Sequence, residues 1–367
     1  MRAREGPPDF ILFIVTLILL CIGLIMVSSA SAVTAGYRLD NPYFFMKKQV
    51  LWVALGIIVM IITMRVNYEK LRELSLPAII IAIVLLLVVF IPGVGKAVKG
   101  STRQIYLGLF NLSPSELAKV CMVLFMSSSL ARHMDGIKDA VRGLLPHLIL
   151  IGLICGLVMM QPDLGTTFII AVTAFVMLSV AGARWEHMAL MAMVGVMALA
   201  LLIYFEPYRM IRFTAFLNPW KYPTSFGFQT IQSLYALGSG GIFGVGLGLS
   251  RQKFFYLPEQ HTDFIFAILG EELGYLGVLV VLTLFLIFAW RGIKTALNAP
   301  DAFGSFLAVG ATSLIIIQAM VNIGVVSGAL PVTGIPLPFI SYGGSSLVIT
   351  MISVGLLLNV SRYARNP

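Results

Sequence analysis

Residues 10–27 read FILFIVTLILLCIGLIMV, an apolar run without a charged residue. Its length is close to the roughly 20 residues that cross a bilayer as a helix. Arg2 and Arg4 precede the run and small residues follow it at 30–32, an arrangement that also occurs at cleavable signal peptides. Because the run exceeds the roughly 7–15 residues of a signal-peptide core, we expect a membrane-spanning helix that is not cleaved.

The composition of the whole chain indicates the same environment. Hydrophobic residues make up 59% and charged residues 11% of the chain, whereas soluble domains average roughly 45–50% and about 25%. The net charge of +9 is spread through short loops rather than gathered in one patch with aromatic residues, so we expect no nucleic-acid partner. Cys21, Cys121 and Cys155 lie inside apolar runs without metal-ligand spacing, and we expect them to be small core residues.

Apolar runs of spanning length recur along the chain. Lipid cannot hydrogen-bond to free backbone groups, so each run must be helical. The sequence therefore predicts an all-α, polytopic integral membrane protein, a single domain over residues 1–367 with about ten transmembrane helices. These helices are expected near Phe10–Val33, Gln49–Met64, Leu76–Phe90, Glu116–Leu130, Leu144–Met160, Leu164–Ala181, Trp185–Phe205, Phe264–Trp290, Phe303–Val326 and Leu347–Val360.

Basic residues predict the orientation of the chain. An even number of spans places both termini on one side, and the short segments on that side carry more Lys and Arg than the short segments on the other. By the positive-inside rule, both termini are expected in the cytoplasm. Residues 206–262, between the seventh and eighth helices, then form a large extracellular loop. We expect function there, because the chain offers few other long polar segments.

Asp263 stands directly before the eighth expected helix. Taken alone, it is best interpreted as an N-cap, which stabilises a helix start by about 1 kcal/mol. Its surroundings favour a second interpretation, since His261 and Glu259 are neighbours and the preceding loop is basic. A carboxylate at the outer membrane boundary beneath such a loop could help to hold an anionic substrate. The basic residues of the loop are Arg209, Arg212, Lys221, Arg251 and Lys253.

Two further sets of ionisable residues lie inside expected helices. Glu271 and Glu272 follow Asp263 along the same helix, where unpaired carboxylates would be costly; buried structural hydrogen bonds and a substrate role both fit. Glu116 and Lys119 are spaced i,i+3 at the start of the fourth helix and can form an ion pair. That pair is either purely structural or shapes a site.

Two segments rich in glycine or proline interrupt the apolar pattern. Residues 238–248, GSGGIFGVGLG, match neither the Walker A pattern nor a strict G-x-G-x-x-G after a strand, so we expect no nucleotide site. They favour close helix packing or a re-entrant turn, since glycines let backbones approach and bend. Residues 331–344, PVTGIPLPFISYGG, break the helix at the outer end of the last two spans and favour irregular backbone that lines a cavity.

Together and in order, these segments and several others resemble the FtsW/RodA/SpoVE family of peptidoglycan polymerases. The resemblance covers nearly the whole chain and is closest to the division and sporulation branches. Two positions in the first large outer loop depart from the family pattern, Gln104 in place of the usual Trp and Ser113 in place of a common Gln. The matching segments are GSTRQI from Gly100, PSELAK from Pro114, QPDLGTT from Gln161, YRMIRFTAFLNPW from Tyr208, GFQTIQSLYALGSGG from Gly227, PEQHTDFIFAILGEELG from Pro258 and NIGVVSGALPVTGIPLPFISYGGSS from Asn322.

The resemblance implies a ten-span enzyme of the cytoplasmic membrane that polymerises lipid II. It places Asp263 at the family's essential aspartate, and Glu116 and Lys119 at its functionally important ion pair. It also implies a single-span class B penicillin-binding protein as crosslinking and activating partner, within the divisome or a related cell-wall complex. Further residues expected to bind substrate or shape the site are Arg103, Arg209, Arg212, Gln229, Ser233, His261, Glu272 and Ser341.

The residues fit the chemistry of that reaction. Glycosidases use two carboxylates because one must protonate a poor leaving group, but a polyprenyl pyrophosphate leaves readily once its charge is neutralised. We therefore expect Asp263 alone to activate or orient the acceptor hydroxyl in an inverting glycosyl transfer. Arg209 and Arg212, with a divalent cation (Mg²⁺ or Mn²⁺) if one takes part, would stabilise the pyrophosphate.

Two other functions fit a membrane protein of this kind. A transporter that flips lipid II would need a hydrophobic groove and polar groups reachable from both faces, whereas the candidate groups concentrate on the outer side. A scaffold would recruit its partner through helix packing without catalysis. Polymer formation from labelled lipid II and scrambling of lipid between vesicle leaflets distinguish the three.

Overall fold

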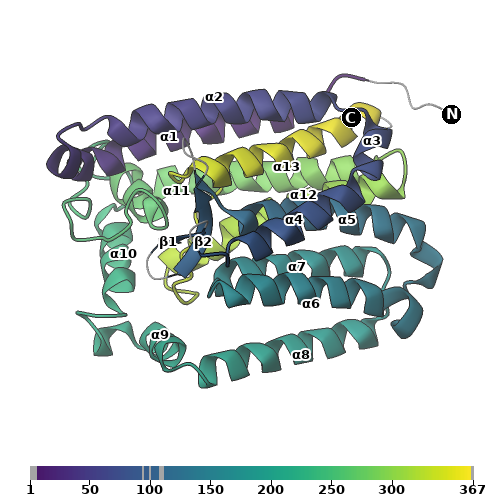
Figure 1. Cartoon of the computed structure of the whole chain (residues 1–367). Helices are drawn as coiled ribbons and strands as arrows, with labels where there is room; N and C mark the ends of the chain where they lie inside the picture. Colours follow the sequence, from purple (N-terminus) through teal and green to yellow (C-terminus); the bar gives the residue numbers. More distant parts are fainter. Residues whose placement is uncertain (1–5, 93–94, 99–100, 107–110, 365–367) are drawn as a thin grey trace.

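The structure, a computed structural model, describes residues 6–92, 95–98, 101–106 and 111–364 and is a bundle of long helices (Figure 1). The long helices are α1 (Phe10–Leu39), α2 (Phe44–Arg65), α4 (Ser75–Val88), α5 (Pro114–Arg132), α6 (Leu145–Met160), α7 (Leu164–Val180), α8 (Trp185–Tyr204), α11 (Ile265–Leu297), α12 (Ala302–Val326) and α13 (Gly344–Tyr363). Shorter helices at the ends of the bundle are α3 (Tyr68–Glu73), α9 (Pro207–Leu217) and α10 (Phe228–Ser239). Short 3₁₀ or π segments occupy Met134–Gly136, Ala140–Leu144 and Pro219–Lys221.

The multi-pass architecture expected from hydropathy is confirmed. Among the described residues, 7 helices are long and apolar enough to cross a membrane, with α6 extended by the preceding π turn. The other three expected spans coincide with α4, α5 and α7. α4 and α7 have 14 and 17 residues, and α5 carries Glu116, Lys119 and Arg132. The expected count of about ten spans is therefore not confirmed by length and hydropathy alone.

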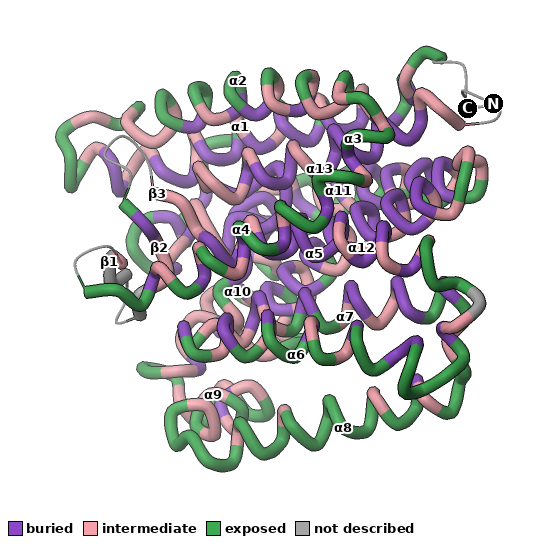
Figure 2. Tube along the Cα trace, turned by 45° about the vertical axis from the view of Figure 1, so that its right-hand side comes forward, coloured by how far each residue is buried: buried purple, intermediate pink, exposed green. Residues whose placement is uncertain are grey.

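The helices differ strongly in how much protein surrounds them. In α12 and α13, 67% and 72% of the most apolar window is buried, against 6% in α8. Figure 2 shows α8 exposed along most of its length at the edge of the bundle. Cys21, expected as a core residue, is likewise exposed on α1. An apolar run cannot distinguish the core from a lipid-facing surface, because hydrocarbon is as favourable a neighbour as the protein interior.

Both termini lie at the same end of the bundle (Figure 1). Gly6 N donates to the Arg362 carbonyl at 2.7 Å. Asp9 caps α1 by accepting from Leu12 N and pairs with Arg291 of α11 at 2.6 Å. The two ends of the chain and the end of α11 are therefore tied together at what we call the termini end.

The strands, α9 and α10 lie toward the opposite end of the bundle (Figure 1). Among the described residues, a three-stranded antiparallel sheet is the exception to an otherwise helical fold, and its short strands show no apolar run that hydropathy could detect. Residues 206–262, expected as one loop, contain α9 and α10 joined through a 3₁₀ turn. The strands are β1 (Gly95–Val98), β2 (Ser101–Tyr106) and β3 (Asn111–Leu112), in the order β1-β2-β3.

The glycine run after α10 packs against a break in α11. Gly274 has φ 67°, which interrupts the helix. Across the break, Val245 N and Gly246 N each donate at 3.0 Å to carbonyls of α11. A Cβ on Gly244 would stand 2.1 Å from the Glu272 carbonyl oxygen, so only glycine permits this approach. The close packing expected from the glycine run is thus present.

Candidate active site

Asp263 lies in the turn that leads into α11, at the irregular end of the bundle. Phe264 occupies the N-cap position of α11 and makes no side-chain capping bond, so Asp263 is not the cap that its place in the sequence suggested. Asp263 is half-buried, and its Oδ2 lies 3.6 Å from the point where a Cβ on Gly334 would stand. Its carboxylate therefore lies against residues 331–343, which we call the Pro/Gly loop.

Asn322 of α12 ties this loop to residues 258–263, which we call the Asp263 segment. Its Nδ2 donates to the main-chain oxygens of Asp263 and Ile335, both at 2.7 Å. Asn322 itself is 1% exposed. Because buried carbonyl groups need hydrogen-bond partners, one amide satisfies two acceptors and sets the spacing between the two segments.

A second set of contacts holds the preceding residues of the Asp263 segment. Ser341 donates through Oγ to the Thr262 carbonyl at 2.6 Å, and Tyr342 N donates to the His261 carbonyl at 2.9 Å. The His261 ring lies between aromatic neighbours, 4.7 Å from Phe45 and 5.7 Å from Tyr342 between ring centres. Burial raises the pKa of the Tyr342 phenol, which therefore stays uncharged at neutral pH.

The ion pair expected within α5 is present and lies beneath the Pro/Gly loop. Lys119 Nζ is 2.9 Å from Glu116 Oε1 and donates to Gln318 Oε1 at 2.7 Å. Gln318 Nε2 in turn donates to the Pro336 carbonyl at 3.0 Å. Since Gln318 and Asn322 are i,i+4 on α12, they share one face and hold the loop at two points.

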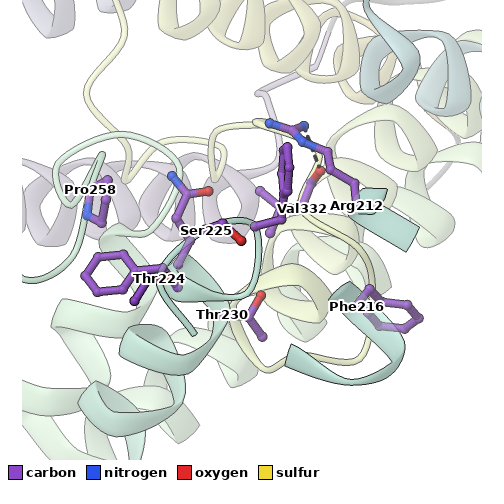
Figure 3. A pocket seen from close by; sticks show the side chains of 10 residues that line it. Arg212, Phe216, Thr224, Ser225, Thr230, Pro258 and Val332 are labelled. Atoms are coloured by element: carbon purple, nitrogen blue, oxygen red, sulfur yellow. Dashed lines mark hydrogen bonds between the residues drawn. The ribbon is translucent and has the colours of Figure 1, made fainter. Parts of the chain in front are cut away.

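A cavity of about 350 Å³ opens beside the Asp263 segment (Figure 3). Pro258 of that segment and Val332 of the Pro/Gly loop form part of its wall. Arg212 of α9 donates through Nη1 to the Val332 carbonyl at 3.4 Å and lies 4.8 Å from the centre of the Tyr208 ring. Gln229 and several hydroxyl and aromatic residues complete the lining, a combination suited to a ligand with sugar and anionic groups. These residues include Phe216, Thr224, Phe226 and Thr230.

Comparison with known proteins places this arrangement in a family. The model of the FtsW/RodA/SpoVE family, described as cell cycle proteins, matches residues 10–366. The chain belongs to the FtsW/RodA/SpoVE family. Stage V sporulation protein E of Bacillus subtilis (strain 168) is 50% identical over 365 residues, which cover 100% of both chains. The probable peptidoglycan glycosyltransferase FtsW of Geobacter sp. (strain M18) is 45% identical over 100% of this chain and 99% of the relative.

Solved structures share the FtsW/RodA/SpoVE architecture. The crystal structure of the Thermus thermophilus rod shape determining protein RodA matches with a TM-score of 0.73 and 27% identity over 98% of each chain. A structure on the coordination of polymerization and crosslinking by a peptidoglycan synthase complex matches with a TM-score of 0.79 and 29% identity. That match covers 97% of this chain and 98% of the other.

Two arginines expected at the family's site, Arg209 and Arg103, are not in the lining of the cavity. Arg209 donates through Nη1 to the Leu202 carbonyl at 3.2 Å, near the end of α8. Arg103 donates through Nε to the Gln161 carbonyl at 3.0 Å, and its Nη1 lies 3.9 Å from Asp163 Oδ2. These contacts anchor β2 to the turn between α6 and α7.

Ser233 and Glu272, also expected at the site, are engaged elsewhere. Ser233 is buried and donates through Oγ to the Val326 carbonyl at 2.6 Å, which fastens α10 to the end of α12. Glu272 is 1% exposed and pairs with Lys253 at 2.9 Å. The next residue back, Glu271, accepts from Arg251 N at 2.8 Å. Of the two roles that the sequence permitted for these glutamates, the structure shows the buried hydrogen bonds.

Buried amides are the functional-site residues that the sequence reasoning overlooked. Gln318 and Asn322 bridge α12 to the Pro/Gly loop, as described above. Gln49 of α2 donates through Nε2 to the Ser341 carbonyl at 3.3 Å, from the other side of the same loop. The signal that could have found them is a polar amide inside an otherwise apolar helix, where it must find a partner.

The side chains near Asp263 offer few ligands for a metal ion. Among the residues that the structure describes, no group of three or more His, Cys, Asp or Glu side chains could hold a metal ion. Mg²⁺ commonly binds through one or two carboxylates together with substrate phosphates. A divalent cation next to Asp263 would therefore take most of its ligands from water and from a phosphorylated substrate, not from the protein.

Proposed function

We propose that this protein is a peptidoglycan glycosyltransferase that polymerises lipid II into glycan strands at the outer face of the cytoplasmic membrane. The observation that carries the proposal is the half-buried carboxylate of Asp263, which belongs to the same turn as Pro258 in the wall of the cavity that Arg212 lines. The relatives support it, because one that is 45% identical along nearly its whole length is named a probable peptidoglycan glycosyltransferase.

Asp263 acts as the general base of the transfer. Its carboxylate takes the proton from a hydroxyl of the acceptor sugar while that oxygen bonds to the anomeric carbon of the donor. The bond from the anomeric carbon to the phosphate oxygen breaks, and its electron pair leaves on the polyprenyl pyrophosphate. Attack opposite the leaving group inverts the anomeric configuration. A positioned base of this kind typically contributes about 10²–10⁴-fold in rate.

Arg212 stabilises the negative charge that develops on the pyrophosphate. It lines the cavity, and a guanidinium can bind two phosphate oxygens at once. Arg209, three residues earlier on α9, bonds to the Leu202 carbonyl outside the lining and adds positive charge from there. When bound with the substrate, a divalent cation, Mg²⁺ or Mn²⁺, would supply further neutralisation of the pyrophosphate charge, while Asp263 supplies the base and Arg212 the fixed cation.

The proposed orientation places both termini in the cytoplasm and the cavity outside. Basic residues in the short segments of the termini end support this assignment. The match to a peptidoglycan synthase complex that combines polymerization and crosslinking supports a crosslinking partner. We infer a single-span class B penicillin-binding protein, within the divisome or a related cell-wall complex of division or sporulation.

The two rival functions have less support. A lipid II flippase needs polar groups that a headgroup can reach from both ends of the bundle. The cavity is lined by residues of α9, α10 and the Pro/Gly loop, at the end of the bundle opposite the termini. A scaffold without catalysis does not account for the half-buried Asp263 carboxylate.

Purified protein with its crosslinking partner and labelled lipid II tests the proposal. The wild-type protein is expected to form polymer that separates on a gel, and Asp263→Asn is expected to lose polymer formation by about 10²-fold or more because amide nitrogen and oxygen are poor bases. Melting temperatures of both proteins serve as the folding control. Normal polymerisation by Asp263→Asn refutes the assignment, and lipid scrambling between vesicle leaflets without polymer supports the flippase.

A further inference from the structure

A buried ion pair outside the cavity lies on the side of the Asp263 segment that faces α1. Lys253 Nζ is 2.9 Å from Glu272 Oε1, and the two side chains are 4% and 0% exposed. Ser29 of α1 donates through Oγ to both oxygens of the Glu272 carboxylate at 2.7 Å. The pair therefore joins α1, the segment before Asp263 and the first part of α11 into one unit.

Gln260 connects this unit to the Asp263 segment. Its Nε2 donates to the Lys253 carbonyl at 3.1 Å and to Thr34 Oγ1 at 2.7 Å, and it lies 3.4 Å from the Ala30 carbonyl. The residue is 5% exposed and stands three positions before Asp263. Its place in space is thus set by α1 and by the main chain of Lys253 together.

The turn between Gln260 and α11 is tight. Thr262 N and Phe264 N both donate to the Glu259 carbonyl, at 3.1 and 3.2 Å. Glu259 has φ 56°, in the left-handed region that residues other than glycine rarely adopt. Such a conformation persists only where the surroundings hold it. A displacement of Gln260 would therefore be transmitted through the turn to Asp263.

The ion pair does not contact the cavity. Lys253 is 3% and Glu272 1% exposed, and neither lines the cavity at Arg212. The Lys253 ammonium is engaged with Glu272 and with Ser29 at 3.2 Å. Charged groups occupied in this way cannot bind a pyrophosphate without breaking a buried pair, so their contribution must be indirect.

We propose that Lys253, Glu272 and Gln260 are positioning residues that fix the Asp263 carboxylate for catalysis. The inference rests on the proposed function. A general base must stand within roughly 2.6–3.2 Å of the hydroxyl whose proton it takes, and a misplacement of about 1 Å can cost on the order of 10²-fold in rate. The bond from Asn322 holds the main chain of Asp263 on one side, and the Lys253–Glu272 pair holds it on the other through Gln260.

Three variants test the role of the pair. Lys253→Met keeps much of the side-chain volume without the charge, Lys253→Arg keeps the charge, and Gln260→Leu keeps the shape without the donors. Each full-length protein, with its crosslinking partner, is assayed on a concentration series of labelled lipid II, and its melting temperature is measured in the same detergent. Lys253→Met and Gln260→Leu are expected to lower kcat roughly tenfold to 10²-fold with KM nearly unchanged. Lys253→Arg is expected to retain most of kcat.

Asp9→Asn is the matched control. It also removes one charge from a buried pair, that with Arg291 at the termini end, and asparagine still caps α1. Its melting temperature is expected to fall while kcat per folded molecule stays at the wild-type value. An equal loss of kcat in Asp9→Asn would mean that lowered stability alone explains the Lys253 result, and would overturn the proposal.

The remaining outcomes separate this inference from the proposed function. A raised KM with normal kcat in Lys253→Met would show direct substrate binding and overturn positioning. If Lys253→Met fails to fold, the double variant Lys253→Met with Glu272→Gln leaves no unpaired charge. A normal kcat in that double variant also overturns the proposal. If Asp263→Asn is inactive and Gln260→Leu has a normal kcat, the positioning role is refuted and the proposed function stands. If Asp263→Asn is active, the proposed function is refuted.

Discussion

Amide side chains link two ion pairs to the Pro/Gly loop and the Asp263 segment, and the two pairs are built in different ways. Glu116 and Lys119 are three residues apart on α5, so the helix itself brings them to 2.9 Å. Lys253 belongs to a loop and Glu272 to α11, so their 2.9 Å contact forms only when the bundle folds. An amide side chain links each pair to the site. Gln318 bonds to the Pro/Gly loop, and Gln260 of the Asp263 segment bonds to the Lys253 carbonyl.

The two pairs support different parts of the site. The α5 pair supports the loop that the Asp263 carboxylate lies against. The Lys253–Glu272 pair supports the main chain that carries the carboxylate. The α5 pair is also the more accessible, since the Glu116 side chain is 13% exposed and that of Glu272 is 0%.

The largest expected effect is on stability. Removing one partner of a buried pair typically costs about 3–5 kcal/mol, because the other charge stays buried and unpaired. Lys253→Met should approach this range, and Lys119→Met should cost less because Glu116 is partly exposed. Unfolding in mixed micelles with increasing denaturant measures both. A larger loss for Lys119→Met would reverse the comparison, and adding Glu272→Gln to Lys253→Met should recover much of its loss.

A smaller effect is expected at the two amides of α12. Asn322→Leu and Gln318→Leu each remove a donor from buried carbonyls, which costs about 1–3 kcal/mol. Their kinetics should differ, since Asn322 bonds to the main chain of Asp263, whereas Gln318 bonds to the loop and to Lys119. We expect the lower kcat in Asn322→Leu on lipid II. If Gln318→Leu has the lower kcat, the loop rather than the Asp263 main chain limits the reaction.

Cations outside both pairs should affect kcat/KM. Arg212→Ala is expected to lower kcat/KM for lipid II about tenfold, or about 1.4 kcal/mol, with part of the loss in kcat, because it removes the charged donor that stabilises the developing charge on the pyrophosphate. Arg209→Ala should lower kcat/KM less, because Arg209 bonds to the Leu202 carbonyl and does not line the cavity. Steady-state kinetics on the two variants, with Lys253→Arg as a control, compare them directly. Equal kcat/KM values for the two variants would contradict the separate placement of the arginines.

The smallest expected effect is that of a divalent cation alone. A ligand stabilises a protein only as far as it binds the folded state, and no group of three or more metal-ligating side chains is found in the described parts of the chain. Addition of Mg²⁺ without lipid II should therefore leave the melting temperature unchanged. A clear rise would reveal a protein metal site near the two pairs, and Asp263→Asn would show whether Asp263 belongs to it.

Much of the fold followed from hydropathy along the chain. Each of the ten expected ranges coincides with a helix. Hydropathy did not predict the sheet of β1–β3 or the helices α9 and α10, because these elements are short and their apolar residues form no spanning run. The N-cap assignment of Asp263 was wrong for a related reason. The start of α11 is set by the tight turn at Glu259 and by contacts to the Pro/Gly loop, which lies more than 60 residues away.

Local sequence is sufficient to predict the membrane-spanning helices and the Glu116–Lys119 pair. The free energy of transferring a helix into lipid is a sum of contributions from residues adjacent in sequence, and side chains spaced i,i+3 lie near each other on any α-helix. The contacts that hold the Asp263 segment depend instead on how the helices pack. Asn322 reaches the Asp263 carbonyl from α12, and Gln260 bonds to residues of α1 and to the Lys253 carbonyl. A buried polar group selects such partners only after packing has excluded lipid and water from around it.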